Sequence, residues 1–246
     1  MPYLHAVHCE HDPMLVVLSY VIAVLGSLTA LQTALAMPNT PGPARVRAML
    51  WAGAAMGFGA IWSMHFIAML GCRMDIPVSY DLGITALSAL IAWASCCAGF
   101  AVAGGERYGR YRLWPAGLLT GLGVSGMHYT GMAAMQMPAT IQWNPLLVAL
   151  SVAIAISAAL IALWLAFHPR GGVQMVGSAL VMGVAVSGLH YTGMAAATFV
   201  PLTGEPPPSP MALTPARLGM LIFAVMAGAL IAGLLAGIAR ERQLLR

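Results

Sequence analysis

Long apolar stretches alternate with short polar segments along the whole chain. Seven of these stretches reach or exceed the roughly 20 residues that a helix needs to cross a bilayer. They run over Met14–Met37, Arg47–Leu70, Leu82–Gly104, Leu113–Met135, Leu146–Phe167, Val173–Val200 and Ala216–Ala239. The first stretch is too long for a cleaved signal peptide, and no Lys or Arg precedes Arg45. The pattern predicts an all-α integral membrane protein with seven transmembrane helices.

A second pattern repeats within these stretches. Near-identical segments carry a histidine at the same point: SMHFIAML around His65, SGMHYTGMAAM around His128 and SGLHYTGMAAA around His190. In the helices before them, an Asp or Asn precedes a serine by seven residues, in the pairs Asp12 and Ser19, Asp81 and Ser88, and Asn144 and Ser151. The sequence therefore predicts three repeated two-helix hairpins, followed by a seventh helix.

The repeats and the loops between them divide the chain into four expected parts. These are a periplasmic N-terminal segment at 1–13, a six-helix core of three repeats at 14–200, a Pro-rich periplasmic loop at 201–215, and a seventh helix with the start of a cytoplasmic extension at 216–246. Gly233 and Gly237 form a GxxxG step on the seventh helix, which permits a homodimer.

Arginines orient the predicted helices. The chain is 60% hydrophobic and 7% charged, has a mean hydropathy of +0.85, and contains no lysine. Nine of the eleven arginines fall in alternate connections or at the C-terminus, and only Arg73 and Arg217 fall on the other side. The positive-inside rule then places the N-terminus outside and the C-terminus in the cytoplasm, in a bacterial inner membrane. Because the net charge of +4 is this signal, we expect no nucleic-acid partner.

The three histidines are the main candidates for chemistry. An imidazole inside an apolar helix is costly without a polar partner, and a single one usually hydrogen-bonds to another helix. Three at one depth favour a bound metal, although one centre and two separate sites both fit the sequence. Pro138 should end the helix of His128 ten residues later, which places the site at most roughly 15 Å below the outer end of the helix.

Sulfur side chains follow the histidines at helical spacing. Met69, Met132 and Met194 lie four residues after each histidine, on the same helix face. Seven residues after a histidine come Cys72 and Met135, again on that face. Because thioether and thiol ligands combined with imidazole select copper, particularly Cu(I), the pattern favours one or two copper ions, with zinc as the alternative.

Other residues near these histidines and sulfur side chains are weaker candidates for binding the metal or surrounding it. These are Met64, Met127, Tyr129, Tyr191, Asp12, Asp81 and Asn144. We interpret the tyrosines as packing residues or hydrogen-bond donors to the ligands. The Asp and Asn residues are suited to capping the first turn of the helices that follow them.

The N-terminal segment HAVHCEHD contains further candidate ligands. His5, His8, Cys9 and His11 lie within seven residues, which fits a loose metal-capturing arm or simply a polar tail. Cys9 and Cys72 both fall at the outer face, where a disulfide between them is compatible with an oxidising periplasm. Cys96 and Cys97 fall inside the third span and are interpreted as small core residues.

At these residues the chain resembles the MHYT domain, a bacterial integral-membrane sensor module. The Met-His-Tyr-Thr motif stands in full from Met127 to Thr130; the third copy has Leu189 in place of Met, and the first copy reads MHFI from Met64. The resemblance implies a site near the periplasmic face that holds one or two copper ions and senses oxygen, carbon monoxide or nitric oxide.

The resemblance also implies a signalling output. MHYT modules are often followed by cytoplasmic diguanylate cyclase and cyclic-di-GMP phosphodiesterase domains. This sequence stops at ARERQLLR, so we expect either a stand-alone sensor or an output that lies beyond residue 246.

Three other functions compete with a sensor. A haem protein could use two of the histidines as axial ligands, but the third would then be surplus. A metal transporter would favour broken helices and acidic residues at mid-depth, and no Asp, Glu or Arg occupies the centre of a predicted span. We do not expect an enzyme, because no nucleophile-base set is present.

Overall fold

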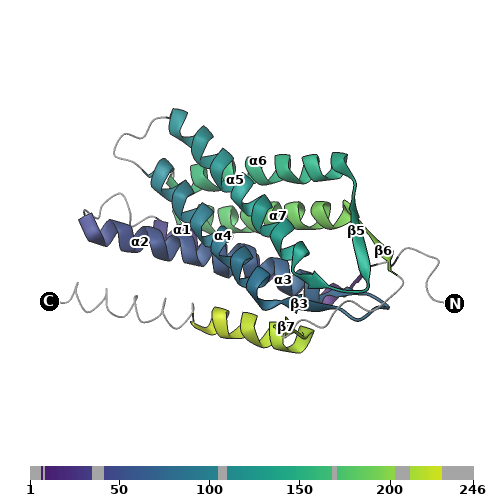
Figure 1. Ribbon diagram of the computed structural model, residues 1–246. Helices are drawn as coiled ribbons and strands as arrows, with labels where there is room; N and C mark the ends of the chain where they lie inside the picture. Colours follow the sequence, from purple (N-terminus) through teal and green to yellow (C-terminus); the bar gives the residue numbers. More distant parts are fainter. Residues whose placement is uncertain are drawn as a thin grey trace.

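The computed structural model describes residues 7, 9–34, 42–104, 110–167, 171–202 and 211–228. Its helices, shown in Figure 1, are α1 (Pro13–Ala34), α2 (Gly42–Ala54), the π-helix η1 (Ala55–Trp62), α3 (Ser63–Leu70), α4 (Leu82–Ala103), α5 (Arg110–Ala133), α6 (Pro145–Phe167) and α7 (Gly172–Ala195). A shorter helix spans Pro215–Gly228. The segments α2, η1 and α3 follow one another without a break, so they form one long helix.

Five of these helical segments are long and apolar enough to cross a membrane: Pro13–Ala34, Gly42–Leu70, Leu82–Ala103, Pro145–Phe167 and Gly172–Ala195. Helix α5 has 24 residues but is not among them, and its first turn contains two arginines. The helix at Pro215–Gly228 is too short within the described residues. The all-α membrane architecture is therefore confirmed, whereas the count of seven spans stays a prediction.

The helices form a closed ring. The long helix α2–η1–α3 packs against α1 and, through α2 and η1, against α4. Helices α5, α6 and α7 follow in turn, and α7 returns to pack against α1. Inside this ring the three histidine-bearing helices α3, α5 and α7 contact one another. The predicted two-helix units are thus α1 with α2–η1–α3, α4 with α5, and α6 with α7.

Short strands join the two ends of every unit, a feature that the sequence analysis did not predict. Each strand before a unit's first helix pairs antiparallel with the strand after its second helix: β1 (Glu10–His11) with β2 (Cys72–Arg73), β3 (Ser79–Asp81) with β4 (Met135–Gln136), and β5 (Ala139–Trp143) with β6 (Ala197–Pro201). Strand β7 (Ala212–Leu213) adds to β3. Labelled strands gather at one end of the bundle in Figure 1, and we call this the strand end.

Equivalent backbone hydrogen bonds recur in the three units. The amides of Asp12, Asp81 and Asn144 each donate to a carbonyl just beyond the histidine-bearing helix of the same unit, and all three distances are 2.8 Å. The side chains of the same residues cap the next helix: Asp12 Oδ1 accepts from Met14, Asp81 Oδ1 from Ile84, and Asn144 Oδ1 from Leu146, at 2.9 to 3.0 Å. These residues fix the helix starts, as the sequence predicted.

The first unit contains an irregularity immediately before its histidine. The π-helix η1 spans eight residues and ends at Trp62, three residues before His65. Glycines let it pack closely on neighbouring helices: a Cβ on Gly57 would meet the backbone of Trp93 at 2.7 Å. Because π-helical turns widen a helix and often occur at functional sites, this segment shapes the space beside the histidines.

Candidate metal centre

The three histidines lie at equal depth in the three inner helices. His65 lies five residues before the end of α3, His128 five before the end of α5, and His190 five before the end of α7. Five residues correspond to roughly 7.5 Å of helix. This depth lies within the predicted limit of roughly 15 Å, and it is smaller because α5 ends at Ala133, before Pro138 is reached.

Their imidazole rings converge on one point. The Nδ1 atom of His65 lies 3.0 Å from Nδ1 of His190 and 3.2 Å from Nδ1 of His128. One ring nitrogen from each histidine lies within 4.8 Å of the other two. The side chains are buried, with 0 to 1% of their surface exposed. The structure therefore brings all three predicted residues together in a single centre.

The other edge of each ring faces packed protein. The Nε2 atoms of His65, His128 and His190 are buried and have no hydrogen-bond partner among the described residues. Gly131 and Gly193, three residues after the second and third histidines, sit so close that a Cβ on either would lie 2.3 Å from the Nε2 atom of His65 or His128, respectively. These glycines are the close-contact surfaces that small residues provide in membrane helices, and they leave room for the Nε2 edges of His65 and His128.

This arrangement fits a metal ion. A neutral imidazole carries one proton, and its unprotonated nitrogen is the ligand atom. Three nitrogens at about 2.0–2.1 Å from one ion would lie about 3.3–3.6 Å apart, which is close to the two Nδ1 separations in this centre. The two Nδ1 contacts of His65 also have hydrogen-bond distances, and an ion would replace these hydrogen bonds between the rings. The buried three-histidine group can thus hold a metal ion.

Hydroxyl groups tie the centre to the outer helices. Tyr129 forms a hydrogen bond to Ser151 at 2.6 Å, and Tyr191 forms one to Ser19 at 3.3 Å. Both tyrosine rings meet the neighbouring histidine edge-on, with ring centroids 4.9 Å apart. Each hydrogen bond runs from one unit to the next, so the tyrosines hold the rings from outside rather than pointing at the centre.

In the first unit, a different residue forms the corresponding hydrogen bond to the serine. Phe66 stands where the other units have tyrosine and cannot hydrogen-bond to Ser88. Instead Trp62 Nε1, one turn earlier, donates to Ser88 Oγ at 3.2 Å. The sequence analysis did not predict that Trp62 takes over the hydrogen bond of the missing tyrosine. The position of this tryptophan, four residues before Phe66, was the signal that could have indicated it.

The methionines lie in the core around the centre. Met69, Met132 and Met194 are buried, as are Met64 and Met127. Leu189 occupies the position of Met64 and Met127 in the third unit and is equally buried. These thioethers therefore lie in the protein interior, and the prediction that they bind a metal stays a prediction.

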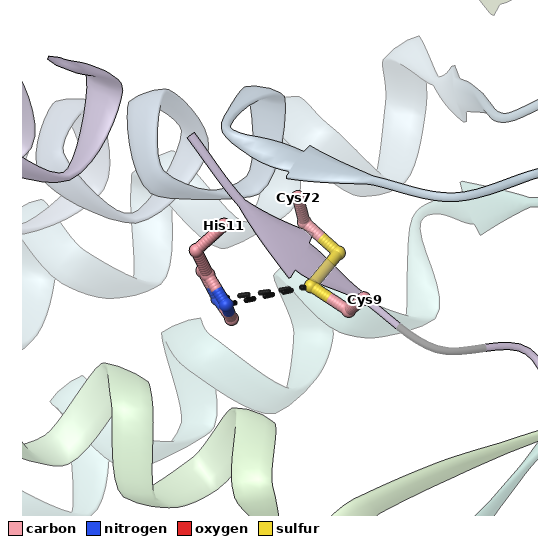
Figure 2. Close-up of a disulfide and its surroundings, with 3 residues drawn as sticks. All are labelled: Cys9, His11 and Cys72. Carbon is pink, nitrogen blue, oxygen red and sulfur yellow. Dashed lines mark hydrogen bonds between the residues drawn. A yellow bond between two sulfur atoms is a disulfide. The ribbon is translucent and has the colours of Figure 1, made fainter. Parts of the chain in front are cut away.

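The predicted row of histidine and sulfur side chains does not continue to Cys72 and Met135 along the helix faces. Cys72 lies in β2 and Met135 in β4, both beyond the ends of their helices. The helical spacing that was used to align them with the histidines therefore does not apply to them. Cys72 instead forms a disulfide with Cys9, which Figure 2 shows beside His11.

The N-terminal candidates separate into two groups. Cys9 and His11 are held at the strand end, because β1 pairs with β2 and Asp12 forms an ion pair with Arg73. Cys9 and His11 therefore belong to an ordered ladder at the strand end, and their role in metal capture stays a prediction. His5 and His8 lie outside the described residues.

An apolar cavity lies about one helical turn from the histidines, on the side away from the strands. It has a volume of about 50 Å³ and shares part of its lining with a second space of about 30 Å³. Its lining includes Ile61, Val124 and Val186, each four residues before a histidine, and therefore one turn away on the same face. Small residues of α6, among them Ala155 and Ala159, leave the space open.

Comparison with known proteins decides the family. A family model described as "Bacterial signalling protein N terminal repeat", MHYT, matches residues 59–116 and 121–179. The bifunctional diguanylate cyclase/cyclic di-GMP phosphodiesterase MucR of Pseudomonas aeruginosa is 43% identical over 195 residues, which cover 77% of this chain and 28% of MucR. The chain belongs to the MHYT family.

Other relatives agree with this assignment to the MHYT family. The cyclic di-GMP phosphodiesterase NbdA of Pseudomonas aeruginosa is 37% identical, over 87% of this chain and 28% of NbdA. The signaling protein YkoW of Bacillus subtilis is 32% identical, over 78% of this chain and 25% of YkoW. The chain thus spans about a quarter of the length of these relatives. No solved structure matches it.

The structure gives the MHYT motif a physical meaning. In the complete copy of the motif, Met127 is buried in the core and His128 is one of the three histidines of the centre. Tyr129 binds the serine of the next unit. Thr130 supplies the carbonyl that accepts the amide of Ala134 at the helix end. The motif therefore combines one of the three converging histidines with the contacts that hold it.

Proposed function

We propose that this protein is a membrane sensor module that binds copper at the centre formed by His65, His128 and His190. The observation that carries this proposal is the convergence of three buried Nδ1 atoms whose rings have no other polar partner among the described residues. Imidazole suits copper and zinc, and the buried thioethers of Met69, Met132 and Met194 favour copper in its reduced form. The centre holds one ion, because all three nitrogens face the same point.

The geometry favours this function over the two alternatives. Haem would require two of these rings on opposite sides of a porphyrin, whereas the three Nδ1 atoms face one another directly. A transporter would continue its ligands across the membrane. The residues one turn below the histidines are Ile61, Val124 and Val186, which have no ligand atoms.

The apolar cavity supports a diatomic gas as the signal. Oxygen, carbon monoxide and nitric oxide are small and apolar, and dry apolar cavities bind such ligands. The cavity includes Leu189, which directly precedes His190 in the chain. A gas that enters from the lipid would therefore arrive beside the three histidines without crossing a polar layer.

The helix at Pro215–Gly228 is the proposed route to the cytoplasm. It follows β7, which pairs with β3, and Leu218 and Ile222 bury against the core. A Cβ on Gly219 would lie 3.7 Å from Leu70, the last residue of the helix that carries His65. A change in how the histidines hold their ligands would shift α3 and so this helix. We place the N-terminus and the strand end in the periplasm of a bacterial inner membrane.

The output we propose is cyclic-di-GMP signalling, carried either by a later part of the same protein or by a partner. MucR and NbdA bear cyclic di-GMP activities in their names, and the family description is that of a bacterial signalling protein. A homodimer through Gly233 and Gly237 also stays a proposal, because these residues lie outside the described part of the chain.

Elemental analysis tests the metal centre directly. Protein purified without added chelator should contain close to one copper per chain, and His65→Ala, His128→Ala and His190→Ala should each lose most of it. His11→Ala, purified with its disulfide intact, is the matched control and should keep full occupancy. Equal metal content in all four variants, or none in the natural protein after copper is supplied, would contradict the proposal.

A further inference from the structure

A second group of metal-ligating side chains lies at the strand end, apart from the three histidines. In the ladder between β1 and β2, His11 stands directly opposite Cys72. Residues directly opposite in an antiparallel pair project to the same face. Cys9 precedes His11 by two residues, and alternate residues of an extended chain share a face. The register therefore places both sulfurs and the imidazole on one face of the ladder.

The distances confirm this placement. The Cα atoms of Cys9 and Cys72 are 5.2 Å apart and their sulfurs are bonded. The Nε2 and Nδ1 atoms of His11 lie 3.7 and 3.8 Å from Cys9 Sγ, as Figure 2 shows. Tyr191 meets the His11 ring edge-on at a centroid distance of 5.3 Å and restricts its orientation. His11 is exposed and the cysteines are half-buried, so the group is accessible from outside the protein.

We propose that reduction of the Cys9–Cys72 disulfide turns this group into a binding site for Cu(I), with two thiolates and the His11 imidazole as ligands. Soft thiolate ligands select Cu(I). With the bond lengths known for zinc, about 2.3 Å to a thiolate sulfur and about 2.0–2.1 Å to an imidazole nitrogen, two ligands of one ion lie about 3.6–3.8 Å apart. The observed separations between His11 and Cys9 Sγ already match this value. The site does not require the three-histidine centre to hold an ion.

The disulfide and the Cu(I)-bound form of this site cannot exist at the same time. A dithiol reductant donates two electrons and two protons to the disulfide and is itself oxidised to a disulfide, which leaves Cys9 and Cys72 as thiols. Binding of Cu(I) then releases the thiol protons to the solvent. In the oxidised state both sulfurs are committed to the S–S bond, so no thiolate is available. Binding at this site therefore depends on the redox state outside the membrane.

Cu(I) titration of the full chain in detergent tests this proposal. One sample keeps the disulfide; the other is reduced with dithiothreitol, which is then removed under anaerobic conditions. Each is titrated with Cu(I) in competition with bicinchoninate. The reduced protein should bind one more equivalent of Cu(I) than the oxidised protein. Equal stoichiometry in the two samples would overturn the proposal.

Variants identify the ligands. Cys9→Ser and Cys72→Ser should lose the additional equivalent, and His11→Ala should weaken it by about tenfold or more. Cys97→Ser is the matched control, because Cys97 is a free cysteine in both states, and it should keep the additional equivalent. Retention of the additional equivalent in Cys9→Ser would overturn the assignment. If a cysteine variant does not fold, the comparison of Cu(I) stoichiometry between the oxidised and the reduced natural protein still tests the proposal.

A third sample separates this site from the three-histidine centre. His128→Ala should lose the central copper and still gain one equivalent of Cu(I) on reduction. Sulfur and nitrogen around copper can be distinguished by X-ray absorption, which should show two sulfurs and one nitrogen for the additional ion. A gain on reduction in protein whose centre never binds copper would support this site and contradict only the proposed function.

Discussion

The hydroxyl of Tyr191, in the last of the three units, lies 3.3 Å from Ser19 Oγ in the first. The same contact joins the second unit to the third, from Tyr129 to Ser151. In both pairs the serine donates to a carbonyl three residues earlier in its own helix, so the tyrosine is the donor between units. The contact at Ser19 closes the ring and holds the first and last units at the distance that lets three imidazoles meet.

Tyr191→Phe should therefore loosen the closure of the ring. The variant removes one hydrogen bond and leaves the serine satisfied by its own helix, so we expect a loss of about 0.5–1.5 kcal/mol in the free energy of unfolding. Copper affinity should fall as well, because His190 precedes this tyrosine directly. Unfolding in detergent and copper titration measure the two effects. Tyr111→Phe, at a tyrosine that is 68% exposed, is the control and should change neither quantity.

Gly193→Ala should disturb the centre more strongly. The new methyl would lie 2.3 Å from Nε2 of His128, so the ring must move, at a cost of about 1–3 kcal/mol. The matched control is Gly188→Ala on the same helix, where the nearest atom, in Ile154, is 3.7 Å away. Metal analysis should show lower copper in Gly193→Ala and normal copper in Gly188→Ala. Full copper in both would mean that this glycine does not set the position of the ring.

Asp81 should act as a helix cap and not as a ligand. Its Oδ1 accepts the amide of Ile84 at 2.9 Å, so Asp81→Ala should lower the free energy of unfolding by about 1 kcal/mol. Asp81→Asn keeps an acceptor and should be nearly neutral. The copper content should be the same in both variants and in the natural protein. A loss of copper in Asp81→Asn would return this carboxylate to the list of ligands.

Filling the apolar cavity should block small apolar ligands and leave the metal in place. Ala159→Val adds two carbons to a wall of the cavity, whereas the control Ala153→Val adds them on an exposed face of the same helix. Xenon, which binds dry apolar cavities, should shift the methyl NMR signals of Met56 and Met182 in the control and not in Ala159→Val. Identical xenon shifts in the two variants would show that xenon does not use this space.

The threefold repeat and its histidines could be predicted because both are written in local patterns. Apolar length identifies the helices, and the repeated His65, His128 and His190 identify the centre without any knowledge of packing. The helix ends were less predictable: α7 stops at Ala195, five residues before the expected Val200. The chain there enters β6, whose hydrogen-bond partner β5 lies more than fifty residues earlier, so no local signal marks the change.

The sequence by itself determined the membrane class, the number of repeats and the identity of the residues that meet at the centre, since hydropathy and period are properties of consecutive residues. Only the tertiary structure decided that one nitrogen of each imidazole points inward, that Trp62 replaces a tyrosine, and that Cys72 pairs with Cys9 rather than lying on the helix face above His65. Those outcomes depend on contacts between segments far apart in the chain, whose geometry is fixed only when the ring of helices closes.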